Sequence, residues 1–222
     1  MRKQICVLAL VLLTGCGAPE TVQSAPNTSD LEAAVEIPAA AALYQDAPLP
    51  EVWEEQVNAV ERSTYIADLA FAPSLEEGIR RADAVVRASV IGYENVLLGD
   101  EQYPTPWTIV SLAVSECLRG DVQAGEHVQM YAMEGWSLGA DGVALYRAFR
   151  FGGLPVKNKE YILCMSKADG ILPEDAYKRL CGRHGMLQIL DDGETLAYVR
   201  YEEPPEKVYT IKMKELLDRI DT

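Results

Sequence analysis

The sequence predicts a β-rich α+β domain, built as a small, partly closed antiparallel β-barrel with flanking helices. Short segments in which apolar and polar residues alternate recur along residues 84–201. A strong turn signal, Asp192-Gly193, separates two apolar runs. Helical signals are confined to the two ends of this region. Several short strands with helices only at the margins are typical of a small barrel.

The strands are predicted from a period of two. In residues 84–91, the small and branched residues Ala84, Val86, Ala88 and Val90 share one face of the chain. Residues 108–118 and 127–133 alternate in the same way, so each segment buries one face. We expect further strands at residues 143–151, 161–166, 186–190 and 195–201, of which the last two form a hairpin.

The helices are predicted from capping and apolar spacing. Ser74 followed by Glu77 forms a capping box, after which Leu75, Ile79 and Ala82 fall on one helical face. Residues 51–62 have a weaker apolar stripe, and residues 211–220 end the chain with a third candidate helix.

The start of the chain carries a targeting pattern. Arg2 and Lys3 precede an apolar run, Ile5 to Leu13, that is too short to span a bilayer. Leu13-Thr14-Gly15-Cys16 then resembles the lipobox of bacterial lipoproteins. The resemblance implies cleavage of a signal peptide, residues 1–15, and a diacylglyceryl thioether on the Cys16 sulfur. The protein would then be lipid-anchored at the extracytoplasmic face of the cell membrane. An ordinary cleaved signal or an uncleaved anchor helix are the alternatives.

The rest of the chain divides into a tether and a domain. Residues 16–50 are rich in Ala, Pro and acidic residues and have no sustained period, which predicts a disordered tether. Residues 51–222 are predicted to form a single barrel-like domain. The whole chain has 34 acidic and 20 basic residues, a net charge of −14. Such a charge repels nucleic acid, so we expect no nucleic-acid partner.

Three cysteines remain after Cys6 leaves with the signal peptide and Cys16 is acylated. A disulfide between Cys164 and Cys181 is one interpretation, because the two lie close in sequence and the compartment is oxidising. The favoured interpretation is that Cys117, Cys164 and Cys181 are buried thiols that act as small hydrophobes.

Residues for catalysis or metal binding are few. The histidines are His127 and His184, and Cys181 and His184 have the spacing of two zinc ligands. No second pair accompanies them, so we expect no metal, no cofactor and no enzyme; Cys181–His184 chemistry is the last-ranked hypothesis. Arg119-Gly120-Asp121 and residues 191–194 are interpreted as turns rather than as an integrin or calcium site.

Aromatic residues gather around residues 103–151 and could line a binding face or belong to the core: Tyr103, Trp107, Trp136, Tyr146, Phe149 and Phe151. We assign Phe149 and Phe151 to the core; for Trp136, both the core and an exposed binding face stay open.

Three segments have a recurring pattern of strands and turns: ADAVVRASVIG, VSECLRGDVQAGEHVQMY and LPVKNKEYILCMSK. Through these segments, residues 74–200 are similar to OB-fold-like domains of secreted bacterial proteins and to the netrin-like barrel. The matching segments contain no catalytic motif, so we expect a non-catalytic domain for partner binding or an envelope structural role. The alternative that the netrin-like resemblance implies is an inhibitor of extracellular proteases. Metalloprotease inhibitors of the netrin-like family use a free N-terminal cysteine, which acylation of Cys16 would block.

Overall fold

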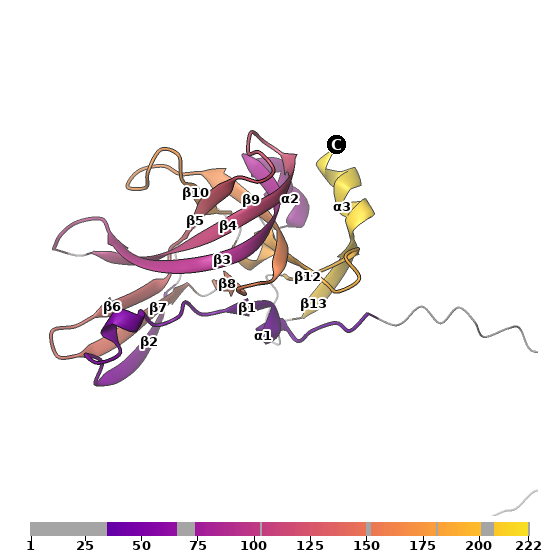
Figure 1. Cartoon of the computed structure of the whole chain (residues 1–222). Helices are drawn as coiled ribbons and strands as arrows, with labels where there is room; N and C mark the ends of the chain where they lie inside the picture. Colours follow the sequence, from indigo (N-terminus) through magenta and orange to yellow (C-terminus); the bar gives the residue numbers. More distant parts are fainter. Residues whose placement is uncertain are drawn as a thin grey trace, which may run out of the picture. The chain divides into compact units, whose positions relative to one another are not determined.

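The computed structural model of the chain describes residues 35–65, 74–102, 104–149, 152–180, 182–200 and 207–221 (Figure 1). The predicted signal peptide, the lipobox-like residues Leu13 to Cys16, and Cys181 lie outside these residues, so the predictions made on them stay predictions. Among the described residues, no helix has both the length and the apolar character needed to cross a membrane.

Five strands form a closed barrel: β3 (Ala84–Leu98), β4 (Thr105–Arg119), β5 (His127–Ala132), β9 (Glu160–Lys167) and β10 (Tyr177–Arg179). Their order around the barrel is β3-β4-β5-β10-β9, and β9 returns to pair with β3. Neighbouring strands are antiparallel except β5 and β10, which run parallel. The predicted β-rich barrel is confirmed. The barrel is closed because β9 pairs with β3, and it contains both parallel and antiparallel pairs because β10 runs parallel to β5.

The alternation in the sequence builds the barrel interior. Val86, Ala88 and Val90 of β3 are completely buried, and they belong to one apolar cluster with Leu112 of β4 and Met130 of β5. Successive side chains of a strand point to opposite faces, so the intervening residues form the outer face.

The sheet continues beyond the barrel on one side. β9 also pairs with β11 (Met186–Ile189), followed by β12 (Thr195–Val199) and β13 (Val208–Lys212). Helices α2 (Leu75–Arg81) and α3 (Met213–Ile220) pack on the outer apolar cluster, which includes Ile79, Ile162 and Leu216. Between β10 and β11 lies a short 3₁₀ helix, η2 (Gly182–Gly185). The predicted capping box is confirmed in part, since the Glu77 amide donates to Ser74 Oγ at 3.2 Å.

A second, three-stranded sheet lies beside the long β3–β4 hairpin (Figure 1). It is ordered β2 (Ala59–Tyr65), β7 (Val143–Phe149), β6 (Gly135–Leu138), with β2 parallel to β7. Asn95 of β3 joins the two parts, because its side chain accepts from the Trp136 amide at 2.6 Å and donates to the Trp136 carbonyl at 2.9 Å.

The predicted tether is wrong at its C-terminal end. Residues 40–50, which we call the strap, contain α1 (Ala40–Leu43) and β1 (Tyr44–Gln45), and β1 pairs with β8 (Leu154–Pro155). Leu43 is fully buried, Tyr161 Oη donates to its carbonyl, and Trp136 Nε1 donates to the Ala47 carbonyl at 2.8 Å. A few apolar residues are enough to hold the strap in place because they pack against the barrel. The sequence of the strap alone does not reveal these distant contacts.

The helix expected over residues 51–62 is also wrong. A 3₁₀ turn, η1 (Glu51–Trp53), is followed by β2, which pairs with β7 along its whole length from Ala59↔Val143 to Tyr65↔Phe149. Pairing with a distant strand outweighs the weak apolar stripe that suggested a helix.

Candidate binding groove

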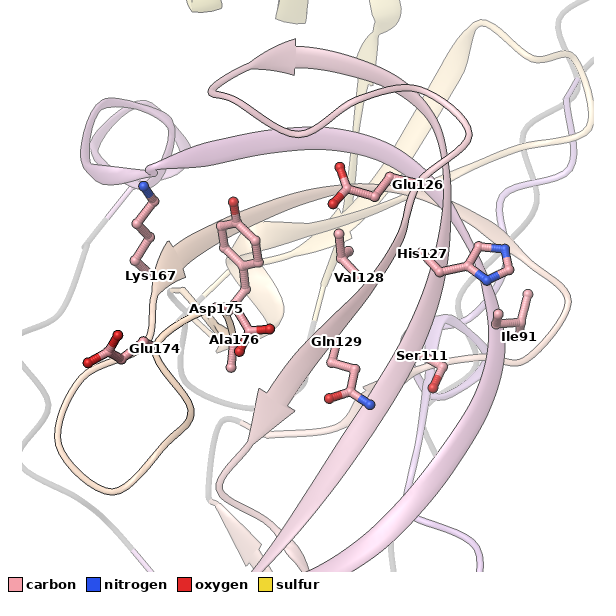
Figure 2. A pocket seen from close by; sticks show the side chains of 11 residues that line it. Ile91, Ser111, Glu126, His127, Val128, Gln129, Lys167, Glu174, Asp175 and Ala176 are labelled. Carbon is pink, nitrogen blue, oxygen red and sulfur yellow. The ribbon is translucent and has the colours of Figure 1, made fainter.

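A groove of about 590 Å³ lies on the outer face of the barrel. One wall consists of Ser111 of β4 and residues 126–129 at the start of β5. Ile91 of β3 also lines the groove. The other wall consists of Lys167 at the end of β9, residues 174–176 of the β9–β10 loop, and Tyr177 at the start of β10. Figure 2 shows the side chains of Glu126, His127 and Gln129 on the first wall and of Glu174 and Asp175 on the second. The volume lies in the range of ligand sites, about 300–1,000 Å³.

The β9–β10 loop is held in place by an apolar cluster on the outer face. Leu172 and Ala176 of the loop pack with Trp107, Ile109 and Tyr131, whose side chains lie on β4 and β5. Within the loop, the Ala168 amide donates to the Ala176 carbonyl at 2.9 Å. The cluster therefore fixes the loop beside β5 and places Glu174 and Asp175 at the groove.

The register of β4 and β5 arranges the first wall. Ser111 lies opposite Gln129, and Ala113 lies opposite His127. Val128, between them, points into the barrel and is buried, so His127 and Gln129 point outward and are exposed.

Negative charge dominates the groove. Three carboxylates, Glu126, Glu174 and Asp175, line it together with one ammonium group, that of Lys167. Burial raises the pKa of Tyr177, and the negative charge of Glu126 raises it further. Burial likewise raises the pKa of Tyr131, with further contributions from Glu94 and Asp175. Both phenols therefore lie in a field that disfavours additional negative charge.

A second, smaller hollow of about 290 Å³ lies over the strap, beside Tyr44, Asp46, Gly153 and Arg183. Tyr44 Oη donates to the carbonyls of Arg183 at 3.1 Å and Met186 at 3.0 Å, and the Arg183 guanidinium lies 5.6 Å from the centre of the Tyr44 ring. These contacts attach the strap to η2 and to the start of β11.

The structure separates the cysteines and histidines named from the sequence. His127 lines the groove, whereas His184 is buried in η2. Cys164 is buried on β9, whereas Cys117 on β4 is partly exposed, so the interpretation of Cys117 as a buried thiol is wrong. The disulfide from Cys164 to Cys181 stays a prediction, because Cys181 lies outside the described residues. Within the described ranges, no group of three or more His, Cys, Asp or Glu side chains is placed to hold a metal ion.

The aromatic residues do not form a binding face where they are described. Trp107, Trp136, Tyr146 and Phe149 are buried. The Trp136 and Tyr146 rings lie 4.8 Å apart, and the Ala47 amide of the strap donates to Tyr146 Oη. The assignment of Phe149 to the core is confirmed, and Trp136 belongs there too. Tyr103 and Phe151 lie outside the described residues.

The two suspected recognition motifs are turns, as expected. Gly120 follows β4 with a φ of 102°, and the Arg119 guanidinium donates to the Ile79 carbonyl at 2.9 Å. Gly193 has a φ of 70°, and Asp192 Oδ1 accepts from the amides of Glu194 and Thr195. Both glycines occupy backbone conformations that other residues rarely adopt.

Sequence reasoning missed the groove itself. Glu174 and Asp175 belong to a polar loop without a motif, and nothing local indicates that β10 begins two residues later. The apolar residues Leu172 and Ala176 on either side of the two acids are the signal that could have indicated an anchored loop. A comparison with models of known protein families found no match, and a comparison with curated proteins found none at the level taken as significant.

Proposed function

We propose that this chain is a bacterial lipoprotein that holds a non-catalytic binding domain at the extracytoplasmic face of the cell membrane. In this proposal the lipid on Cys16 anchors the protein, residues 17–39 separate the lipid from the strap, and the groove binds a component of the cell envelope. Lipid attachment at Cys16 and ligand binding in the groove are tested separately.

The position of the groove is the observation that carries the binding role. The strand order β3-β4-β5-β10-β9, with its single parallel pair, supports the proposal of an OB-fold-like barrel. OB-fold barrels bind ligands on the face of their second and third strands, beside the loop between the fourth and fifth. The corresponding parts here are β4, β5 and the β9–β10 loop, and these line the groove.

The charge of the groove narrows the class of ligand. OB-fold barrels often bind oligonucleotides, but phosphates placed in this groove would approach Glu126, Glu174 and Asp175. Like charges in contact are unfavourable, so a nucleic-acid ligand is disfavoured. A neutral or cationic envelope component is the ligand that the groove supports.

Lipid attachment is tested with Cys16→Ser in bacteria that produce the full chain. Metabolic labelling with an alkyne analogue of palmitate should mark the wild-type protein and leave Cys16→Ser unmarked. Equal labelling of both proteins contradicts lipidation at Cys16.

Binding at the groove is tested by site-specific photo-cross-linking in intact cells. A photoreactive phenylalanine derivative replaces Gln129, which is exposed in the groove, or Thr210, which is exposed on β13. We expect a discrete cross-linked product from position 129 and none from position 210. Products of equal abundance from both positions, or none from position 129, contradict a ligand in the groove.

A further inference from the structure

The start of β5 has a free main-chain edge at the groove. The Glu126 carbonyl accepts from the Val114 amide at 2.9 Å, and main-chain groups of alternate residues point the same way in an antiparallel ladder. The groups of Val128 and Met130 therefore face β4, whereas those of His127 and Gln129 face away from it.

β10 covers only the later part of this edge. The parallel ladder between the two strands begins at the pair Tyr177↔Met130. In this ladder the Gln129 carbonyl faces β10 as an acceptor, and the Gln129 amide lies before the first ladder bond. Among the described residues, no strand pairs with the outer edge of residues 127–129. The His127 amide and carbonyl and the Gln129 amide thus face the groove.

Unpaired strand edges accept an additional strand from a partner. Many proteins protect such an edge with a lysine or a proline, or cover it. Here the β9–β10 loop stands opposite the edge instead of covering it, since the space between them is the groove. Three of the four side chains of Lys, Asp or Glu that line the groove are acidic: Glu126, Glu174 and Asp175, against Lys167.

We propose that the groove binds an extended, basic segment of a polypeptide, which pairs with the edge of β5 at His127 and Gln129 and directs lysine or arginine side chains to Glu126, Glu174 and Asp175. This inference rests on the proposed binding function and names the class of its ligand. Main-chain hydrogen bonds to β5 would position the bound segment, and the carboxylates of the groove would favour a positively charged segment.

The probes are three synthetic peptides of seven residues, titrated into the full chain at low ionic strength, where exposed ion pairs are screened least. The first alternates lysine and threonine, the second alternates glutamate and threonine, and the third is the first with N-methyl groups on alternate amides. We expect the lysine peptide to bind, and the glutamate peptide and the N-methylated peptide not to bind. Binding of the glutamate peptide, or equal binding of the N-methylated one, overturns the proposal.

Amide hydrogen exchange locates the pairing. With the lysine peptide bound, exchange should slow at the amides of His127 and Gln129, which face the groove. The Val128 amide, which faces β4, is the internal control and should not change. Binding without slower exchange at His127 and Gln129 contradicts strand pairing.

Matched variants test the role of charge. E174Q/D175N removes two charges from the groove, and E54Q/E55Q removes two from the exposed turn that follows η1. Two exposed ion pairs together contribute roughly fivefold to affinity, so the first variant should weaken lysine-peptide binding by about that factor. The second should leave the affinity unchanged. Equal affinities for the two variants contradict the proposed role of the carboxylates.

The two proposals fail in different ways. If cross-linking from Gln129 captures a ligand but the lysine peptide does not bind, the groove is a binding site and the ligand class named here is wrong. If position 129 captures nothing in cells, the binding function itself is wrong, whatever the peptides do.

Discussion

The Glu134 carboxylate lies 2.6 Å from Nη1 of Arg179, and the two side chains are only 1% and 5% exposed. Both carboxylate oxygens also accept from the Gly153 amide at 3.0 Å, and Nη1 of Arg179 donates to the Gly153 carbonyl. Glu134 follows β5, and Arg179 is the last residue of β10. The ion pair thus links the two parallel barrel strands whose upstream ends define the groove.

Breaking this ion pair should strongly destabilise the protein. Arg179→Met leaves the Glu134 carboxylate buried without its cation, and loss of one partner of a buried pair costs about 3–5 kcal/mol. The double variant E134Q/R179M buries no charge and keeps an acceptor for Gly153, so it should recover part of the loss. Urea unfolding measures the free energy of unfolding of the single and the double variant. A loss below about 1 kcal/mol for Arg179→Met would show that the pair is not buried as described.

The strap should contribute to stability as a core element does. Leu43→Ala removes a fully buried side chain and should lower the free energy of unfolding by about 2–5 kcal/mol. Val52→Ala, at a residue that is 78% exposed just after the strap, should change it by less than about 0.5 kcal/mol. Thermal and urea unfolding compare the two. Equal, small effects would mean that the strap behaves as part of the tether.

The start of α2 should make stability depend on acid pH. Hydrogen bonds from Arg80 and Arg81 lower the pKa of Glu77 from 4.5 to about 2. A carboxyl whose pKa is lower in the folded state stabilises the protein above its unfolded pKa, and this contribution is lost as the pH falls from 4.5 through 2. Glu77→Gln should therefore reduce the loss of stability over that interval, measured as the urea midpoint at several pH values. Glu55→Gln, at an exposed position, is the control; if both variants keep the wild-type slope, Glu77 does not contribute.

The turn after β4 should tolerate only glycine. At Gly120, with φ of 102°, a Cβ would lie 2.4 Å from the Asp83 carbonyl oxygen, whereas at Gly125, with φ of 88°, a Cβ would meet no atom within 4 Å. Gly125→Ala should cost about 1 kcal/mol from the backbone conformation alone. Gly120→Ala should cost at least 1 kcal/mol more because of the added contact. Equal unfolding free energies for the two variants contradict the close approach of Gly120 to Asp83.

Local patterns predict the parts of this fold in which each residue's neighbours are near in sequence. The alternation of Val86, Ala88 and Val90 indicates the face that β3 buries, and Ser74 indicates where α2 begins. The Asp192-Gly193 signal indicates the hairpin between β11 and β12. These features depend on side-chain period and turn chemistry alone.

Other parts depend on partners that are distant in sequence. β2 has mostly exposed residues and forms because β7 pairs with it, and Leu43 is buried because the barrel lies under the strap. The groove depends on the β9–β10 loop packing against Trp107 and Tyr131, which are more than 35 residues away in the chain. No pattern within the loop carries that information, so His127 could be named from the sequence but its place in an acidic groove could not.

We propose that the ligand of this protein binds between β5 and the β9–β10 loop. The most direct measurement is hydrogen-exchange mass spectrometry of the full-length protein, alone and in complex with the component that cross-links in cells. We predict slower exchange at the His127 and Gln129 amides and in residues 168–177 on binding, and no change in β13, residues 208–212. Protection at β13 or the strap, with no change at residues 126–129, would contradict it.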